Sequence, residues 1–267
     1  MYKAVICFDL DGTLLDPQEK IRQPDKDTLL QNTDYLFVPA TGRSLESVKR
    51  LFHLNQLVVD QNIPYPLITL NGGAGYAPQE ETAFEFLFSA DEKKEIFSII
   101  EKNTHISYLL QSTTGSYLLW PNQFSLSCLH RYKLQYESED QIPQGYDFVK
   151  VMCFCEDSNQ MQEFVSSLDG LPIEKAFGTP FIYELTPLGV NKGSTLKALI
   201  NRMGLSHLPV FAAGDGGNDV ETFRVANRSF APKGSLQFVI DAADELIEPD
   251  GKGLLPQIIE RSRNLVC

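Results

Sequence analysis

The sequence predicts an α/β fold: a parallel sheet with helices on both faces, interrupted by an inserted α+β domain. Three observations support this prediction. Short apolar runs alternate with helical patterns up to about residue 75 and again after Pro187. The stretch between these regions carries hairpin-like pairs of strands instead. Apolar runs near both ends of the chain finish in glycines and acids, and the carboxyl ends of parallel strands gather at one edge of a sheet.

The first region alternates strand and helix patterns. Its segments in chain order are 4–8 (strand), 25–32 (helix), 35–38 (strand), 44–54 (helix) and 67–70 (strand). Parallel strands need crossover connections, which are right-handed, so this alternation predicts a parallel sheet. After Pro187 the pattern resumes with helices at 194–203, 220–226 and 254–263 and a strand at 210–213.

Residues 76–187 are predicted to form the inserted domain, which leaves 1–75 and 188–267 as the core. Two hairpins are expected in the insertion, 106–111 with 116–120 and 171–176 with 181–185. A further β-like piece covers 82–88, helical periodicity appears at 91–102 and 159–168, and the polar segment 136–145 is expected to be a surface loop. These patterns predict an antiparallel sheet with helices on one face. Such an insertion explains the order of elements without long structureless loops.

The composition excludes several classes of partner. The chain has 267 residues, 43% of them hydrophobic, which suffices for a sizeable core, and its formal net charge is −12. Nucleic acids and anionic membranes select basic patches, so neither is an expected partner. No apolar stretch reaches the roughly 20 residues that span a bilayer, and the first run is too short for a signal peptide, so a cytoplasmic location is expected. Five cysteines without a C-x-x-C pair fit reduced thiols. The sequence does not distinguish a monomer from a dimer.

Two carboxylates, those of Asp9 and Asp11, directly follow the first apolar run. Gly12 comes next, so both acids are expected in a loop at the end of a buried strand. Like charges in such a place are unfavourable unless a cation or a change of protonation compensates them. The pattern therefore indicates a reaction centre. The alternative is a pair of acids in a strand-terminating turn, as Asp16 is expected to be a turn acid.

Two later segments supply positive or anion-binding groups for a carboxylate nucleophile. Thr41-Gly42-Arg43 lies between an apolar run and a helix, and a hydroxyl, a glycine amide and a helix N-terminus together make an anion site. Lys192 starts a helical segment, from which its ammonium group can reach a phosphate or neutralise Asp9. The alternatives are a helix N-cap for Thr41 and a solvated first-turn position for Lys192.

A fourth segment, residues 211–219, ends another apolar run with glycines and polar side chains. It contains Asp215, Asn218 and Asp219. Carboxylate oxygens are the ligands that hard divalent cations prefer. The segment therefore predicts metal ligands at the tip of a strand.

These four segments, in this order, resemble the haloacid dehalogenase superfamily of phosphohydrolases. The D-x-D-G-T-L sequence is specific for that superfamily, and G-D-x-x-N-D is strong in combination with it. The long insertion, preceded by Asn71-Gly72-Gly73, resembles the Cof-type branch, which has a Rossmann-like core and a large α/β cap. The chain departs from the branch in one place, because Phe230-Ala231-Pro232-Lys233-Gly234-Ser235 stands where an A-M-G-N-A turn is usual. Since this loop is expected near the catalytic edge, the departure weakens any inference about the substrate.

The resemblance implies a role for each residue in the reaction. Asp9 attacks the phosphorus atom and forms an aspartyl-phosphate. Asp11 protonates the leaving alkoxide and then takes a proton from the water that cleaves the intermediate. Thr41, Gly42 and Lys192 hold the phosphoryl group. A phosphatase of small phosphorylated metabolites is thus expected.

The resemblance also implies Mg²⁺ as the cofactor. Its ligands would be Asp9, the main-chain carbonyl of Asp11 and Asp215, with Asn218 and Asp219 in support. Electrostatics predicts such an ion independently of the resemblance. A phosphate monoester repels an anionic nucleophile unless cations draw negative charge from its oxygens.

Substrate selection is expected to lie in the inserted domain, since the core chemistry is common to all monoesters. A sugar phosphate is the favoured substrate, and Arg43 and Asn71 are candidates for contacts with its body. The insertion also offers side chains that can stack on or hydrogen-bond a sugar, or equally can pack within hairpins: Tyr117, Trp120, Tyr183 and Glu184.

Two other functions fit the same residues. A phosphomutase or phosphotransferase would use the same aspartyl-phosphate but return the group to a sugar. A non-catalytic binding protein is disfavoured because Asp9, Asp11, Lys192 and Asp215 are all intact.

Overall fold

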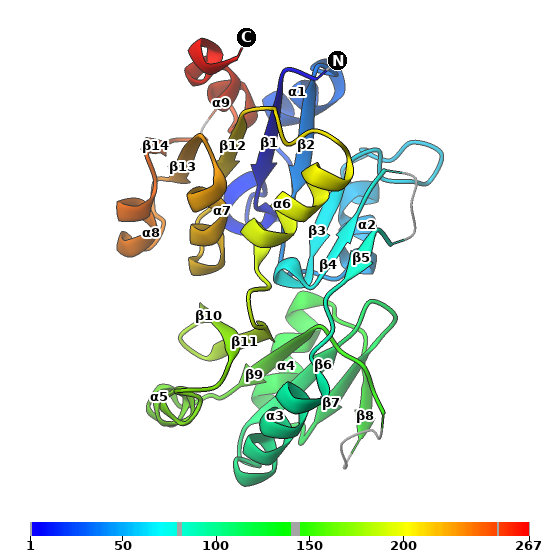
Figure 1. The fold of residues 1–267 in the computed structure, drawn as a ribbon, viewed down its shortest axis with the longest axis vertical. Coiled ribbons are helices and arrows are strands. Elements are labelled where there is room, and N and C mark those ends of the chain that lie inside the picture. The colour runs from blue at the N-terminus through cyan, green and yellow to red at the C-terminus, as the bar shows by residue number, and fades with distance from the viewer. Residues whose placement is uncertain (1, 79–81, 140–144, 250, 267) are drawn as a thin grey trace. The chain divides into compact units, whose positions relative to one another are not determined.

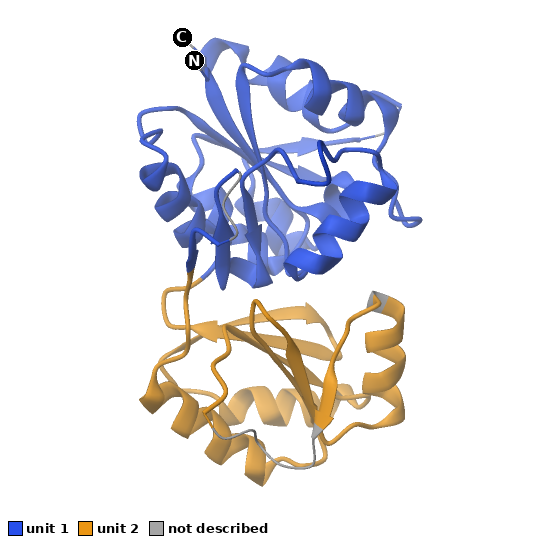
Figure 2. Cartoon of the chain, turned by 90° about the vertical axis from the view of Figure 1, so that its right-hand side faces the viewer, with its two compact units in different colours: residues 1–84, 191–267 blue, residues 85–190 orange. Residues whose placement is uncertain are grey.

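Two compact units make up the computed structural model, which describes residues 2–78, 82–139, 145–249 and 251–266. One unit consists of residues 1–84 and 191–267, and the other is Glu85–Val190 (Figure 2). The second unit is thus continuous in sequence and is inserted into the first, so the chain runs twice between them.

The core of the first unit is a parallel five-stranded sheet in the order β14-β13-β12-β1-β2 (Figure 1). Its strands are β1 (Ala4–Phe8), β2 (Tyr35–Pro39), β12 (Val210–Ala213), β13 (Arg228–Pro232) and β14 (Glu245–Ile247). At the carboxyl edge Phe8 lies opposite Pro39 on one side and Ala213 on the other. The loops that follow β1, β2 and β12 therefore start side by side.

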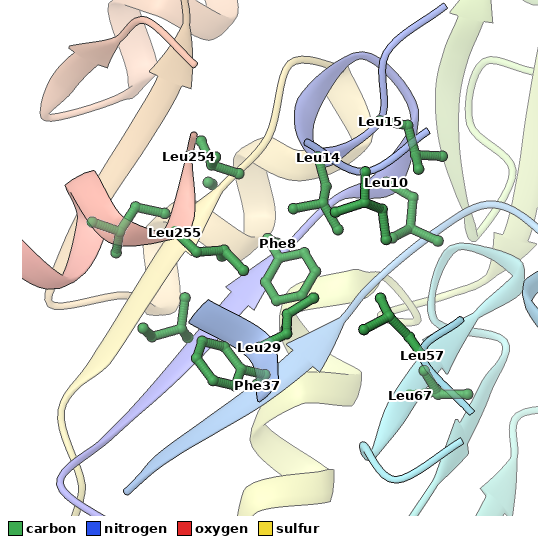
Figure 3. Close-up of a cluster of buried hydrophobic side chains, with 14 of the residues drawn as sticks. Phe8, Leu10, Leu14, Leu15, Leu29, Phe37, Leu57, Leu67, Leu254 and Leu255 are labelled. Atoms are coloured by element: carbon green, nitrogen blue, oxygen red, sulfur yellow. The ribbon is translucent and has the colours of Figure 1, made fainter. Parts of the chain in front are cut away.

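Helices cover both faces of this sheet, which confirms the predicted fold. They are α1 (Gln23–Gln31), α2 (Leu45–Leu54), α6 (Lys192–Arg202), α7 (Val220–Val225), α8 (Gln237–Ala242) and α9 (Leu255–Arg261). Phe8 and Phe37 face one layer, where they meet Leu29 of α1 and Leu255 of α9 (Figure 3). The alternate residues of β1 face α6, as Cys7 does. Burial of each such side chain contributes about 1.5–3 kcal/mol.

A smaller sheet continues the first unit beside β2. It contains β3 (Leu67–Thr69), β4 (Ala74–Tyr76) and β5 (Phe84–Glu85), and a bridge between Ala40 and Ile68 joins it to the end of β2. Between β3 and β4 the chain turns with positive φ at Leu70 and Asn71. Only Phe84–Glu85 of the β-like piece predicted at 82–88 is a strand.

The inserted unit is built on a six-stranded sheet in the order β10-β11-β9-β6-β7-β8. Its elements are α3 (Ala90–Lys102), β6 (Ser107–Gln111), β7 (Ser116–Leu119), α4 (Gln123–Tyr132), β8 (Glu137–Glu139), β9 (Lys150–Phe154), α5 (Ser158–Ser167), β10 (Ile173–Thr179) and β11 (Ile182–Pro187). Both predicted hairpins, β6–β7 and β10–β11, are present.

Two predictions for this unit were wrong. Helices lie on both faces, because α3 and α5 contribute Ile96 and Met161 to one core and α4 contributes Leu129 to another. The signal for α4 was its capping box, in which Oδ1 of Asn122 accepts from the Ser125 N–H at 2.8 Å. The segment 136–145 is not all loop either, since β8 pairs in parallel with β7, while residues 140–144 lie outside the described residues.

Within the described residues, no helix is long and apolar enough to cross a membrane.

Candidate active site

Lys192 lies buried at the carboxyl edge of the sheet, between two carboxylates. Its Nζ donates hydrogen bonds to Oδ1 of Asp9 at 2.6 Å and to Oδ1 of Asp219 at 2.7 Å. Asp9 directly follows β1, and its N–H donates to the Ala213 carbonyl at 2.9 Å, so the sheet ladder holds its backbone. Lys192 is only 1% exposed, so it is not a solvated first-turn residue.

Burial dominates the electrostatics of this group. It raises the pKa of Asp9 well above its usual value; Lys192 opposes the shift, while Asp219 and Asp215 add to it. Burial alone would lower the pKa of Lys192, but the two carboxylates outweigh burial and raise it. The ammonium group therefore stays charged, as the only cation that these interactions bring to Asp9.

Asp219 connects Lys192 to the loop after β12. Its Oδ2 accepts from the N–H of Asp215 at 3.1 Å and from the N–H of Gly216 at 3.0 Å, while Oδ1 accepts from Lys192. The position of the Asp219 carboxylate requires a glycine at 214, because a Cβ there would collide with the Asp219 side chain. Asp219 thus holds the shape of the loop and pairs with the lysine at once.

Asp215 is held by the turn that follows Asp9. The Thr13 hydroxyl donates to Oδ1 of Asp215 at 2.7 Å, a contact that the sequence reasoning missed although Thr13 belongs to the D-x-D-G-T-L segment. Gly12 has φ +78°, and a Cβ there would meet the Asp215 carboxylate. Burial raises the pKa of Asp215 to about 6; Thr13 lowers it, and Asp219 raises it further.

Three carboxylates converge closely enough to hold a metal ion. One oxygen from each of Asp9, Asp215 and Asp219 lies within 4.8 Å of the others. Three acids with one lysine leave negative charge uncompensated, and this charge adds to burial, the larger cause, in raising the pKa values of Asp9 and Asp215. The residues therefore fit a hard divalent cation such as Mg²⁺. The side chain of Asp11 is not in this group, and the resemblance assigns the metal only its main-chain carbonyl.

The side chain of Asp11 pairs with Arg43 instead. Arg43 donates from Nε to Oδ2 at 2.7 Å and from Nη2 to Oδ1 at 2.6 Å. A third donor, Nη1, contacts Oε1 of Glu19 at 2.9 Å, a partner that sequence reasoning did not include. The guanidinium of Arg43 is thus engaged by two acids of the loop after β1.

Thr41 lies next to the strand that carries Asp9. The N–H of Ala40 donates to the Phe8 carbonyl at 2.9 Å, and that of Thr41 donates to Ile68 at 2.9 Å. The Thr41 hydroxyl accepts from the Arg43 N–H at 3.1 Å. Gly42 sits between these two residues. The N-cap of α2 is Ser44, so Thr41 does not cap that helix.

Asn71 and Asn218 meet each other. Nδ2 of Asn218 donates to Oδ1 of Asn71 at 3.0 Å, and the Asn71 N–H donates to the Thr41 carbonyl at 3.1 Å. Asn71 has φ 58°, a conformation that asparagine tolerates better than most residues. The turn after β3 therefore ties the second and fourth segments together.

The segment that departs from the family pattern begins inside β13 and continues beyond it. Lys233, which would add a cation near the edge, donates from Nζ to Oε2 of Glu248 at 2.8 Å. Asp16 accepts from the N–H groups of Gln18 and Lys20, as expected for a turn acid.

The four residues considered for sugar contacts make packing or ionic contacts inside the inserted unit. Three of the contacts are edge-on ring pairs, and the fourth is an ion pair: Tyr117 with Tyr146, Trp120 with Tyr108, Tyr183 with Phe177 and Glu184 with Lys150.

Comparisons with known proteins agree with this fold. The profile of the haloacid dehalogenase-like hydrolases matches residues 6–253. An uncharacterized hydrolase of Schizosaccharomyces pombe is 28% identical over 98% of this chain and 91% of its own length. An HMP-PP phosphatase of Escherichia fergusonii is 28% identical over 80% of this chain and 78% of its own.

Solved structures share the fold over almost the whole chain. A protein from Thermotoga maritima superposes with a TM-score of 0.80 at 23% identity and covers 98% of this chain and 97% of its own. A sugar phosphatase of haloacid dehalogenase subclass IIB has a TM-score of 0.80 at 20% identity and covers 97% and 98%. The resemblance seen in the sequence is confirmed, and the chain belongs to the haloacid dehalogenase-like hydrolases.

Proposed function

We propose that this hydrolase is a Mg²⁺-dependent phosphatase that acts through an aspartyl-phosphate on Asp9. The observation that carries the proposal is the convergence of Asp9, Lys192, Asp215 and Asp219 at the end of β1 and β12. A nucleophilic carboxylate needs positive charge beside it, and Lys192 provides that charge at 2.6 Å.

The ion would be held by Asp9 and Asp215, with Asp219 near them, and would draw negative charge from the phosphoryl oxygens. In the first step an Asp9 carboxylate oxygen forms a bond to phosphorus as the ester P–O bond breaks, and Asp11 gives a proton to the leaving alkoxide. In the second step water attacks the phosphorus atom, Asp11 accepts its proton, and Asp9 and inorganic phosphate are released. Lys192 and the Thr41-Gly42 segment would bind the phosphoryl group throughout.

The substrate we infer is a small phosphorylated metabolite, with a sugar phosphate favoured. Two relationships support this choice: one relative is named for dephosphorylation of HMP-PP, and a similar fold belongs to a sugar phosphatase. The inserted unit, Glu85–Val190, would select among such substrates. Cys7, Cys128, Cys153 and Cys155 are free thiols, which fits the reducing cytoplasm as the proposed location.

The decisive experiment is a screen of the purified protein against phosphorylated metabolites with Mg²⁺ and with excess EDTA. Release of phosphate that EDTA abolishes is expected, and Asp9→Asn should reduce it to background while circular dichroism shows a folded protein. Activity that survives exhaustive chelation, or in verified Asp9→Asn protein, would contradict the mechanism. Transfer of phosphate between positions of one sugar, without release, would identify a mutase.

A further inference from the structure

Arg43 joins two acids that lie on the same loop. It donates two hydrogen bonds of 2.7 and 2.6 Å to the Asp11 carboxylate and one of 2.9 Å to the Glu19 carboxylate. The planar guanidinium suits such two-point binding of a carboxylate. Asp11 alone would be loosely held, because its side chain is 55% exposed, whereas those of Arg43 and Glu19 are 13% and 23% exposed.

Glu19 is itself fixed by several contacts. It has φ 60°, which turns the loop, and the buried Asn55 donates to its carbonyl at 3.0 Å. Asn55 also accepts from the N–H of Ile21 at 2.9 Å, so the loop is fastened to the end of α2 on both sides of Lys20. Arg50 adds hydrogen bonds to both oxygens of the Glu19 carboxylate at 3.2 and 3.3 Å. The carboxylate is therefore anchored independently of Arg43.

We propose that Glu19 is a positioning residue for Asp11 and acts through Arg43. Glu19 binds Nη1 of the guanidinium. The Nε and Nη2 atoms on the opposite edge then hold the Asp11 carboxylate in one orientation. The proton-transfer role of Asp11 rests on the proposed function, but the positioning contact does not. A misaligned proton-transfer group lowers kcat, because the reacting groups must approach one another within a narrow range of distances and angles.

A merely structural role for Glu19 would lower the free energy of unfolding on substitution and leave kcat unchanged, whereas the proposed role predicts the reverse. The side chains of Arg43 and Glu19 are mostly buried, but glutamine keeps an oxygen that can accept from both arginines, so Glu19→Gln should change the free energy of unfolding in urea only modestly. Its effect should instead appear in kcat, while KM stays near the wild-type value because Thr41 and Lys192 bind the phosphoryl group separately.

The first test is a double-mutant cycle between Glu19 and Asp11, measured with glucose 6-phosphate, which has a poor leaving group. Glu19→Gln is expected to lower kcat on the order of tenfold, a fraction of what an intact acid–base group contributes. In the Asp11→Asn background the same change should have no further effect. Glu46→Gln is the matched control, because Glu46 is an exposed acid in the first turn of α2. Equal losses in both backgrounds would overturn the proposal.

The second test needs no activity, so it separates this inference from the proposed function. NMR measures how fast the Nε–H proton of Arg43 exchanges with water, with the signal assigned by its loss in Arg43→Lys. Glu19→Gln should accelerate the exchange severalfold, and Glu46→Gln should not. An unchanged exchange rate would show that Glu19 does not hold the guanidinium. Failure of the wild type to release phosphate from any ester would instead reject the proposed function alone.

Discussion

Lys192 and Asp219 form a buried hydrogen-bonded ion pair of 2.7 Å, and Asp219 uses its second oxygen for the amides of Asp215 and Gly216. The cation and the loop that presents Asp215 are therefore one unit. A substitution of Lys192 should therefore alter the conformation of this loop, and a substitution in the loop should alter the environment of Asp9.

Removing this cation should destabilise the protein. Lys192→Met leaves the carboxylates of Asp9 and Asp219 buried without it, and breaking a buried pair in this way costs about 3–5 kcal/mol. Urea unfolding in the presence of EDTA measures the loss. Lys197→Met, on the exposed side of the same helix, should change the free energy of unfolding by less than about 0.5 kcal/mol. Equal effects of the two substitutions would show that the pair contributes nothing specific.

Binding of Mg²⁺ should stabilise the folded protein. A ligand that binds only the folded state adds about 2.7 kcal/mol at a concentration 100 times its Kd, so the thermal midpoint should rise with added Mg²⁺. Asp215→Asn should remove most of this rise, because it removes one of three converging carboxylates. Asp241→Asn, an exposed acid of α8, serves as control. A Mg²⁺-dependent rise that persists in Asp215→Asn would place the ion elsewhere.

Gly12 should be intolerant of even one methyl group. Alanine at φ +78° is strained by roughly 1–2 kcal/mol, and here its Cβ would also push on the Asp215 carboxylate, which adds about 1–3 kcal/mol. Gly170→Ala isolates the first effect, because Gly170 has φ +83° but open space around it. Thermal unfolding with and without Mg²⁺ compares the two. If both variants lose the same stability, the contact with Asp215 is unimportant.

Asp25 should make stability depend on pH in a defined direction. Burial raises its pKa, although the N–H groups of Leu255 and Leu254, each donating at 2.7 Å, oppose the shift. The folded state thus favours the protonated acid, so the contribution of Asp25 is fully present below its unfolded pKa of about 3.9 and is lost as pH rises through the folded value. Asp25→Asn keeps an oxygen for both amides without the charge. Its free energy of unfolding relative to wild type should therefore increase with pH over that window.

Asp34 provides the control with the opposite sign. Its hydrogen bond with Lys3 lowers the pKa of Asp34, so its contribution is present above the unfolded pKa and is lost as pH falls through the folded value. The stability of Asp34→Asn relative to wild type should fall, not rise, as pH increases. Urea titrations at several pH values decide both cases, and parallel curves for Asp25→Asn and wild type would contradict the first.

Local patterns predicted the strands β1, β2 and β12 of the core sheet, whereas β13 and β14 were missed. Strands such as Ala4–Phe8 are apolar on both faces because helices cover both, and this continuous run is visible without any tertiary information. The order of strand and helix then brings Asp9, Thr41 and Asp215 to the same edge. Lys192 was placed in the first turn of a helix, but its burial depends on two partners far away in the sequence.

The contacts that were missed depend on tertiary placement. Glu19 contacts Arg43 because Glu19 itself takes a positive φ and because Asn55, at the end of α2, donates a hydrogen bond to its carbonyl. Thr13 contacts Asp215 across the sheet edge, and no periodicity encodes such a pair. Similarly, β8 forms only because β7 offers it an edge. Sequence patterns report burial and turns, whereas side-chain partners require the register of the sheet.

The position of β1 between β2 and β12 has consequences during synthesis. Val5 pairs with Leu36 on one side but with Val210 on the other, so the nascent chain can form only the β1–β2 half of this arrangement until the whole insertion has left the ribosome. The insertion is continuous in sequence and can complete its own sheet earlier. We expect amide protons of β9 to gain protection before those of β12 in pulse-labelled refolding as well, since distant pairings form slowly. Earlier protection of β12 would contradict this order. Until β12 arrives, β1 exposes an unpaired edge, and such an edge is a template for pairing with another chain.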